Sequence, residues 1–236
     1  NSSDTRTSTW VPGEDYRNYL SVSEENVFNY ASVYYNQRGD VHPPLYYIFL
    51  HTICSIFRFG FSKWQGLAIN ILFMCLTLFV LFRMVSRFLG GESVAFATVL
   101  AYGFSCAIMT TTVFLRMYAL LTLIVVCCCY VHLELADQEF RLSKSLKRKL
   151  IFVVLMGYMT HYYFVLYAIG IALVSCIWMV WKRKWRALAA YLGALVGSAL
   201  LGIMIWPFSL KHVFSGYRGR ESLNALRSDN FYWVKL

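Results

Sequence analysis

Five long runs without a charged residue constrain this chain more than any other feature. They hold 19, 23, 17, 32 and 24 residues, and they lie between Lys63 and Arg83, Glu92 and Arg116, Arg116 and Glu134, Lys149 and Lys182, and Arg186 and Lys211. A helix needs about 20 apolar residues to cross roughly 30 Å of hydrocarbon. Four of the runs therefore predict one membrane helix each, and the fold class predicted is an all-α polytopic membrane protein.

The run of 32 residues is too long for one straight crossing. The polar residues of segment 160–163 (THYY) interrupt it. We expect a short helix near 148–160 and a full one near 162–181, which meet at a membrane surface. The chain then has about six transmembrane helices.

Composition agrees with a membrane protein. Hydrophobic residues make up 58% and charged residues 14%, against roughly 45–50% and about 25% in soluble domains. This excludes an ordinary cytosolic enzyme, a disordered tail and a secreted disulfide scaffold. The net charge of +10 is typical of cytoplasmic loops beside anionic lipids, so we expect a membrane-lipid partner and no nucleic acid.

The basic residues also predict an orientation. The loops at 83–92, 134–149 and 182–186 hold 11 of them, whereas the turns near Arg116 and His161 hold one. The positive-inside rule makes the first three loops cytoplasmic. If 150–181 were a single crossing, the loop at 182–186 would lie outside, so the rule favours two helices there. We expect a multi-pass protein of the plasma membrane with its active site on the extracytoplasmic face.

Three regions follow from this topology. Residues 1–65 form an extracytoplasmic loop, in which the short apolar stretch 45–57 is an interfacial helix. Residues 66–206 form the transmembrane domain, and residues 207–236 form a second extracytoplasmic segment. The outer loop needs a helix upstream to carry it across, so we expect the chain to be a fragment whose first membrane helix precedes Asn1.

An acidic and an imidazole side chain stand before a rigid helix start. Asp40 and His42 directly precede Pro43 and Pro44, which fix φ and donate no backbone hydrogen bond. The position favours a catalytic carboxylate beside an imidazole at headgroup depth. It equally fits an ordinary helix start, where acidic residues and Pro are both favoured, and both interpretations stay open.

Further candidates lie on the same predicted side. Arg116 stands alone between two membrane runs, where a charge is costly unless it meets water or an anion. Guanidinium suits phosphate, so we predict that Arg116 binds it with Tyr118 nearby; a snorkelling arginine is the structural alternative. His161 and Tyr162 are predicted as substrate-binding residues, although a lone histidine is more often structural. Three basic residues follow the last run: Lys211, Arg218 and Arg220. They either bind a phosphate or belong to a solvated loop.

The shared theme is a phosphate at the membrane boundary with a carboxylate beside it. A lipid phosphate fits better than a small ion, whose path needs polar groups at mid-bilayer. Metal spacings such as Cys-x-x-Cys are absent from the sequence, so we predict no metal site and no certain cofactor, and leave a divalent cation open.

Residues 40–47 (DVHPPLYY), followed by Phe49, Leu50 and His51, resemble the His-Pro-Pro-Leu-Tyr-Tyr signature of bacterial integral-membrane glycosyltransferases. These belong to the GT-C superfamily, with the protein O-mannosyltransferases and the lipid A aminoarabinose transferase. Segment 115–121 (LRMYALL) resembles the family's Arg-Met-Tyr element, and segment 160–163 resembles its Thr-His-Tyr segment. Order and approximate spacing match over residues 15–180.

The resemblance implies a polyprenyl-phosphate sugar donor and a transfer that usually inverts the anomeric centre. By position, His42 and Arg116 match phosphate-facing basic residues, and Asp40 is the carboxylate that can be named. The family's principal catalytic acid follows the first membrane helix, so the base is expected upstream of this chain. Glu14 and Asp15 lie too far into the loop to replace it. The sugar and the acceptor stay open.

One alternative belongs to another class. A polytopic transporter or lipid-carrier flippase, without covalent chemistry, predicts polar or broken helices near the midplane. The runs at 66–82 and 187–206 offer only Asn70 and small residues for that purpose. A purely structural membrane subunit would tolerate loss of both His42 and Arg116.

Overall fold

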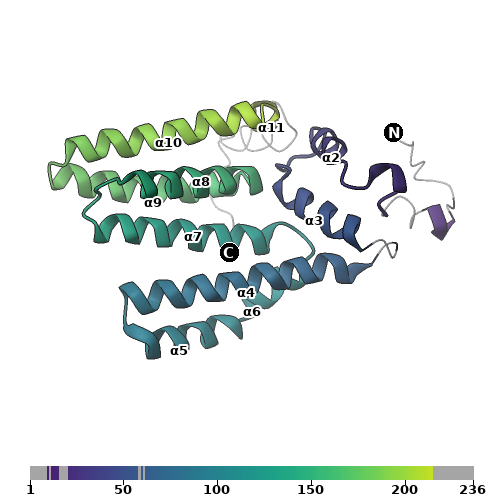
Figure 1. Ribbon diagram of the computed structural model, residues 1–236, viewed down its shortest axis with the longest axis horizontal. Helices are drawn as coiled ribbons and strands as arrows, with labels where there is room; N and C mark the ends of the chain where they lie inside the picture. The colour runs from purple at the N-terminus through teal and green to yellow at the C-terminus, as the bar shows by residue number, and fades with distance from the viewer. Residues whose placement is uncertain (1–9, 11, 16–20, 58–59, 61, 215–236) are drawn as a thin grey trace, which may run out of the picture.

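The computed structural model describes residues 10, 12–15, 21–57, 60 and 62–214, and this part of the chain is helical without a strand (Figure 1). A short 3-10 turn, η1, covers Glu24–Asn26. The α-helices follow in chain order: α2 Tyr30–Gln37, α3 Leu45–Ile56, α4 Lys63–Phe88, α5 Gly91–Gly103, α6 Cys106–Val113, α7 Tyr118–Asp137, α8 Lys144–Thr160, α9 Tyr163–Trp181, α10 Trp185–Ile205 and α11 Phe208–Phe214. The predicted all-α polytopic fold is confirmed.

Four helices, α4, α7, α9 and α10, are long and apolar enough to cross a membrane, and the bent pair of α5 and α6 makes a fifth if it counts as one span. The expected number was about six. The difference is α8, which has 17 residues. Its first turns carry four basic side chains, so its apolar part is short: Lys144, Lys147, Arg148 and Lys149.

The predicted division of the 32-residue run is confirmed. α8 ends at Thr160 and α9 begins at Tyr163. At His161 the backbone is extended, with φ −160° and ψ 139°, which ends the helix and reverses the chain. The two helices therefore form a hairpin with His161 and Tyr162 at its corner.

The run between Glu92 and Arg116 differs from the single crossing that its length predicted. α5 and α6 meet at an angle of 57°. The hydroxyl of Ser105 caps the new helix by accepting from the Ile108 N–H at 3.5 Å, and it donates to the Tyr102 carbonyl at 2.7 Å. A local capping residue therefore starts a new helix inside a run that carries no charged residue.

The helices form a bundle with two distinct ends (Figure 1). α4 packs against α5 and α7, and α8 packs against α7 and α10. The predicted basic loops share one end, where ion pairs join them: Arg87 with Glu134 at 3.9 Å and Lys184 with Glu139 at 2.6 Å. α3, the α6–α7 turn and the α8–α9 corner lie at the other end.

One outward face of α9 is apolar and exposed. Leu166, Ile169, Leu173 and Ile177 are between 52% and 69% exposed, and their spacing places them along one stripe of a helix. A soluble monomer rarely exposes such a stripe. In a bilayer the same stripe faces lipid.

Candidate functional site

The loop between α2 and α3 holds Asp40 and His42 together. The Nδ1 atom of His42 lies 3.3 Å from Oδ1 of Asp40, and the same oxygen accepts from the Val41 N–H at 2.6 Å. The hydroxyl of Tyr47 donates to Oδ2 at 3.4 Å. The hydrogen bond from His42 holds the pKa of Asp40 below its ordinary value, against the opposing effect of burial. Asp40 is therefore ionised at neutral pH.

The double proline places this pair on the body of the bundle. Pro43 and Pro44 are buried, and His42 is only 7% exposed. Because an ionised carboxylate only accepts hydrogen bonds, Nδ1 of His42 carries the proton toward Asp40. The opposite ring nitrogen, Nε2, is left for another partner.

The corner between α8 and α9 brings His161 against this loop. The rings of His42 and His161 have centroids 5.3 Å apart, and the ring of Tyr118, at the start of α7, lies 5.8 Å from His161. Nδ1 of His161 accepts from the Tyr163 N–H at 3.0 Å, which orients the ring. Three segments that are distant in sequence thus place His42, Tyr118 and His161 in one cluster.

Arg116 lies at the exposed edge of this cluster, in the turn between α6 and α7. Its guanidinium carbon is 5.8 Å from the centroid of the Phe114 ring. In the described part of the chain the Arg116 guanidinium makes no ion pair. Burial raises the pKa of Tyr47 to about 12, and the charges of Asp40 and Arg116 act on this hydroxyl in opposite directions. The Tyr47 hydroxyl therefore lies within electrostatic range of both the Asp40 carboxylate and the Arg116 guanidinium.

Tyr162 makes its hydrogen bonds with residues outside the histidine cluster. Its hydroxyl accepts from Nε1 of Trp206 at 3.1 Å and lies 3.0 Å from Nδ1 of His212. Nε2 of His212 donates to the Arg38 carbonyl at 3.0 Å, while Nδ1 pairs with the Tyr162 hydroxyl. This chain of hydrogen bonds ties α9, α11 and the end of α2 together two residues before Asp40. A substrate contact for Tyr162 stays a prediction, because its hydroxyl is already occupied.

An apolar cavity of about 490 Å³ borders the same end of the bundle. It begins at Leu45, directly after the double proline, and continues between α4, α7 and α8 as far as Lys149. Apolar side chains such as Phe49, Phe73 and Leu120 line it. Such a lining suits a hydrocarbon chain.

Comparison with known proteins decides the family. The family model of dolichyl-phosphate-mannose-protein mannosyltransferase matches residues 41–206, well over half of the chain. The chain belongs to this family. No curated protein and no solved structure matches it.

The mannosyltransferase family consists of membrane glycosyltransferases that use lipid-linked sugar donors, and the resemblance to GT-C enzymes is confirmed. The matched range contains His42, Arg116, Tyr118, His161 and Tyr162 and starts one residue after Asp40. It therefore covers every helix from α3 to α10. The roles of the individual side chains stay predictions.

Sequence reasoning assigned no role to Asn70, which this mannosyltransferase-family chain uses to hold the site together. Its Nδ2 donates to the carbonyls of Thr112 and Phe114, each at 3.0 Å, and its Oδ1 accepts from the Tyr46 hydroxyl at 3.3 Å. Those carbonyls end α6, where a helix leaves its last acceptors without intrahelical partners. Asn70 thereby fixes the Arg116 turn to α3. The available signal was a polar side chain inside an apolar run, because such a residue is rarely without function.

Other predicted features fall outside this cluster. No group of three or more His, Cys, Asp or Glu side chains in the described ranges gathers closely enough to hold a metal. Lys211 is exposed on α11, and Arg218 and Arg220 lie outside the described residues. The same holds for residues 215–236 of the predicted C-terminal segment.

Proposed function

We propose that this chain is part of a membrane glycosyltransferase that moves a sugar from a polyprenyl-phosphate donor to an acceptor hydroxyl, with inversion, on the extracytoplasmic face of the plasma membrane. The observation that carries the proposal is the meeting of His42, Arg116 and His161 at one end of the bundle, within the range matched by the family. Each comes from a different segment of the chain.

The phosphate of the donor binds between these basic groups. When His42 is protonated, Nδ1–H donates to Asp40 and Nε2–H is left to donate to a phosphate oxygen. Arg116 approaches from the exposed side with its forked donors, which match two oxygens at once. As the bond between the anomeric carbon and the phosphate oxygen breaks, charge grows on the leaving phosphate. Donors that are fixed in place stabilise that charge most in a site with little water.

The acceptor oxygen forms the new bond to the anomeric carbon, from the face opposite the phosphate. Its proton passes to a carboxylate. Asp40 is ionised and stands beside His42, so it is the carboxylate of this chain that we assign to that role. A positioned base contributes about 10²–10⁴-fold to the rate.

The apolar cavity supports a polyprenyl donor. It begins at Leu45 and is lined by apolar residues of α3, α4, α7 and α8. A chain of isoprene units in this cavity would place its terminal phosphate at the level of the double proline. The membrane-lipid partner expected from the sequence is then the donor itself.

The test is sugar transfer by the full-length protein with a labelled polyprenyl-phospho-sugar, in membranes that lack their own copy and supply the acceptor. The variant is Arg116→Ala, and Arg83→Ala is the control, because Arg83 is an exposed arginine at the other end of α4. We expect Arg116→Ala to lower kcat about 10²–10³-fold, which is the usual cost of removing one donor that stabilises the charge of the transition state. Undiminished transfer by Arg116→Ala would overturn the phosphate role.

A lipid-carrier flippase is the second candidate, and the bend between α5 and α6 is the observation that favours it, because broken helices are common in transporters. The same membranes distinguish the two. Labelled product supports the transferase, whereas movement of the labelled lipid across the bilayer without product supports the flippase.

A further inference from the structure

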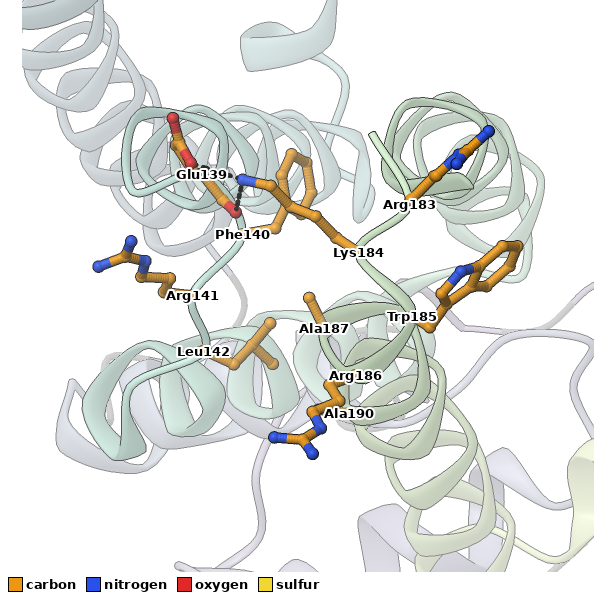
Figure 2. Close-up of a pocket in the computed structure, with 10 residues that line it drawn as sticks. All are labelled: Glu139, Phe140, Arg141, Leu142, Arg183, Lys184, Trp185, Arg186, Ala187 and Ala190. Carbon is orange, nitrogen blue, oxygen red and sulfur yellow. Dashed lines mark hydrogen bonds and ion pairs between the residues drawn. The ribbon is translucent and has the colours of Figure 1, made fainter. Parts of the chain in front are cut away.

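A second cavity lies at the end of the bundle opposite the histidine cluster. Its volume is about 710 Å³, and it lies between the α7–α8 loop and the α9–α10 loop with the start of α10 (Figure 2). Neither His42 nor Arg116 borders it. The proposed transfer reaction therefore makes no use of this cavity.

The floor of the cavity is apolar. Phe140 is buried, and it packs against Trp178 with ring centroids 5.0 Å apart. Leu142 and Ala187 continue this surface, and Ala190 extends it along α10 (Figure 2). The small side chains of α10 leave room beside Leu142 for an apolar group.

The rim of the cavity is cationic. Lys184 is already paired, because its Nζ donates to Oε2 of Glu139 at 2.6 Å and to the Glu139 carbonyl at 3.0 Å. Arg141, Arg183 and Arg186 also line the cavity and are exposed. Within the described ranges these three guanidinium groups have no carboxylate partner. The rim therefore carries an excess of positive charge, because Glu139 is the one carboxylate among the lining residues and Lys184 already pairs with it.

The side chains divide the rim into two parts. In Figure 2, Arg141 and Arg186 project on the side of Leu142, and Arg183 projects in the opposite direction, near Trp185. Arg141 and Arg186 thus flank the apolar floor at Leu142 from two different sides (Figure 2). Arg183 adds charge from the other side.

Two tryptophans indicate the depth of the cavity in the membrane. Trp181 ends α9 and Trp185 begins α10, and they are 75% and 59% exposed. Exposed tryptophans concentrate where the hydrocarbon meets the headgroups. The cavity therefore lies at headgroup level, where basic pockets between membrane helices bind lipid phosphates.

We propose that this cavity binds the phosphate headgroup of an anionic phospholipid. Arg141 and Arg186 hold the phosphate oxygens, for which guanidinium groups are well suited. The glycerol end of the lipid rests on the floor formed by Phe140, Leu142 and Ala187. The ligand is a membrane lipid and not free phosphate, because an ion would leave the apolar floor uncovered.

The experiment uses the complete protein, purified in detergent and stripped of lipid. Binding of phosphatidylglycerol in mixed micelles is measured by native mass spectrometry and by the shift in Tm. Phosphatidylcholine micelles and inorganic phosphate are the comparison arms. The variant removes the three unpaired charges: Arg141→Gln, Arg183→Gln and Arg186→Gln. The control removes three exposed charges from the first turns of α8, outside the cavity lining: Lys144→Gln, Lys147→Gln and Arg148→Gln.

We expect the cavity variant to bind phosphatidylglycerol at least about tenfold more weakly, since each basic residue close to a lipid phosphate contributes about fivefold to the affinity. The α8 control should keep most of the affinity. An equal loss in both triple variants, or none in either, would overturn the proposal. Equal stabilisation by inorganic phosphate would overturn the choice of a lipid.

A second variant tests the cavity without changing its charge. Ala190→Trp fills the hollow beside the apolar floor while all the arginines remain. We expect it to reduce the retained phosphatidylglycerol at least about threefold, because the glycerol end loses its place. Full retention of lipid by a folded Ala190→Trp protein would show that surface charge alone attracts the lipid, which contradicts a built site.

Discussion

The imidazole rings of His42 and His161 lie with their centroids 5.3 Å apart, although one precedes α3 and the other joins α8 to α9. If both rings act on one donor phosphate, their contributions are coupled. We expect His42→Ala and His161→Ala each to lower kcat at least about tenfold, and the double variant to lose less than the product of the two, because groups that act as a unit are not additive.

The measurement is the initial rate of transfer at saturating donor, with Tyr163→Phe as a control that keeps its ring beside that of His161. Strictly multiplicative losses would argue that the two histidines contact different groups. Normal rates in both single variants would remove them from the phosphate site.

The second prediction concerns Asn70. Replacing it with Leu leaves the carbonyls of Thr112 and Phe114 without their donor, and each buried group without a partner costs about 1–3 kcal/mol. We expect Asn70→Leu to lower Tm and to reduce transfer, because the Arg116 turn loses its link to α3. Thr77→Val on the same helix removes only a bond within α4, from the threonine hydroxyl to the Phe73 carbonyl. If Thr77→Val impaired transfer as much as Asn70→Leu did, the effect would belong to α4 as a whole.

Some of this architecture follows directly from the sequence. The polar segment around His161 predicts a chain reversal, because four polar or hydrogen-bonding residues cannot remain inside a membrane helix without partners. The charges predict which loops share an end of the bundle, and the Lys184–Glu139 pair is found there. These features depend on local composition, so a single sequence reveals them.

Other features depend on partners that are far away in the chain. The bend between α5 and α6 lies at one capping serine, Ser105, which the sequence does not distinguish from the other Ser and Thr residues of that run. Tyr162 is adjacent to His161 but turns toward Trp206 and His212, and no pattern around position 162 specifies those partners. The role of Asn70 likewise depends on backbone carbonyls of another helix. Sequence reasoning predicted which segments meet at this end of the bundle but not the direction of their side chains.

The third prediction is a pH dependence of stability. The pKa of Asp40 is lower in the folded protein than its ordinary 3.8, chiefly because of the hydrogen bond from His42. Ionised Asp40 therefore stabilises the fold at pH values above 3.8, and this contribution is lost as the pH falls through the lowered pKa. We expect Asp40→Asn to have a lower Tm near neutral pH and a smaller decrease of Tm on acidification below pH about 4.

The variant His42→Ala should also show a smaller decrease of Tm on acidification, because it removes the main cause of the lowered Asp40 pKa. The check is Tm in detergent from neutral pH to pH about 3, the range in which a depressed carboxyl titrates. If Tm decreased equally at low pH in the wild type and in Asp40→Asn, this carboxylate would make no net contribution to the stability of the fold.

The last prediction concerns the close packing that holds the His161 corner. Gly157 lies one turn before the end of α8, and a Cβ atom at this position would overlap the ring of Phe164 on α9. Phe164 is 1% exposed, so its ring has no free space to occupy and the two helices must separate. Overpacking of this kind costs about 1–3 kcal/mol, so we expect Gly157→Ala to lower Tm and to reduce transfer by displacing His161. Gly170→Ala, on α9, is the matched control because its added methyl group meets no atom within 4 Å. Gly170→Ala should keep the Tm and the transfer rate of the wild type. A loss equal to that of Gly157→Ala would show that the number of glycines, and not the contact with Phe164, determines the stability of the α8–α9 corner.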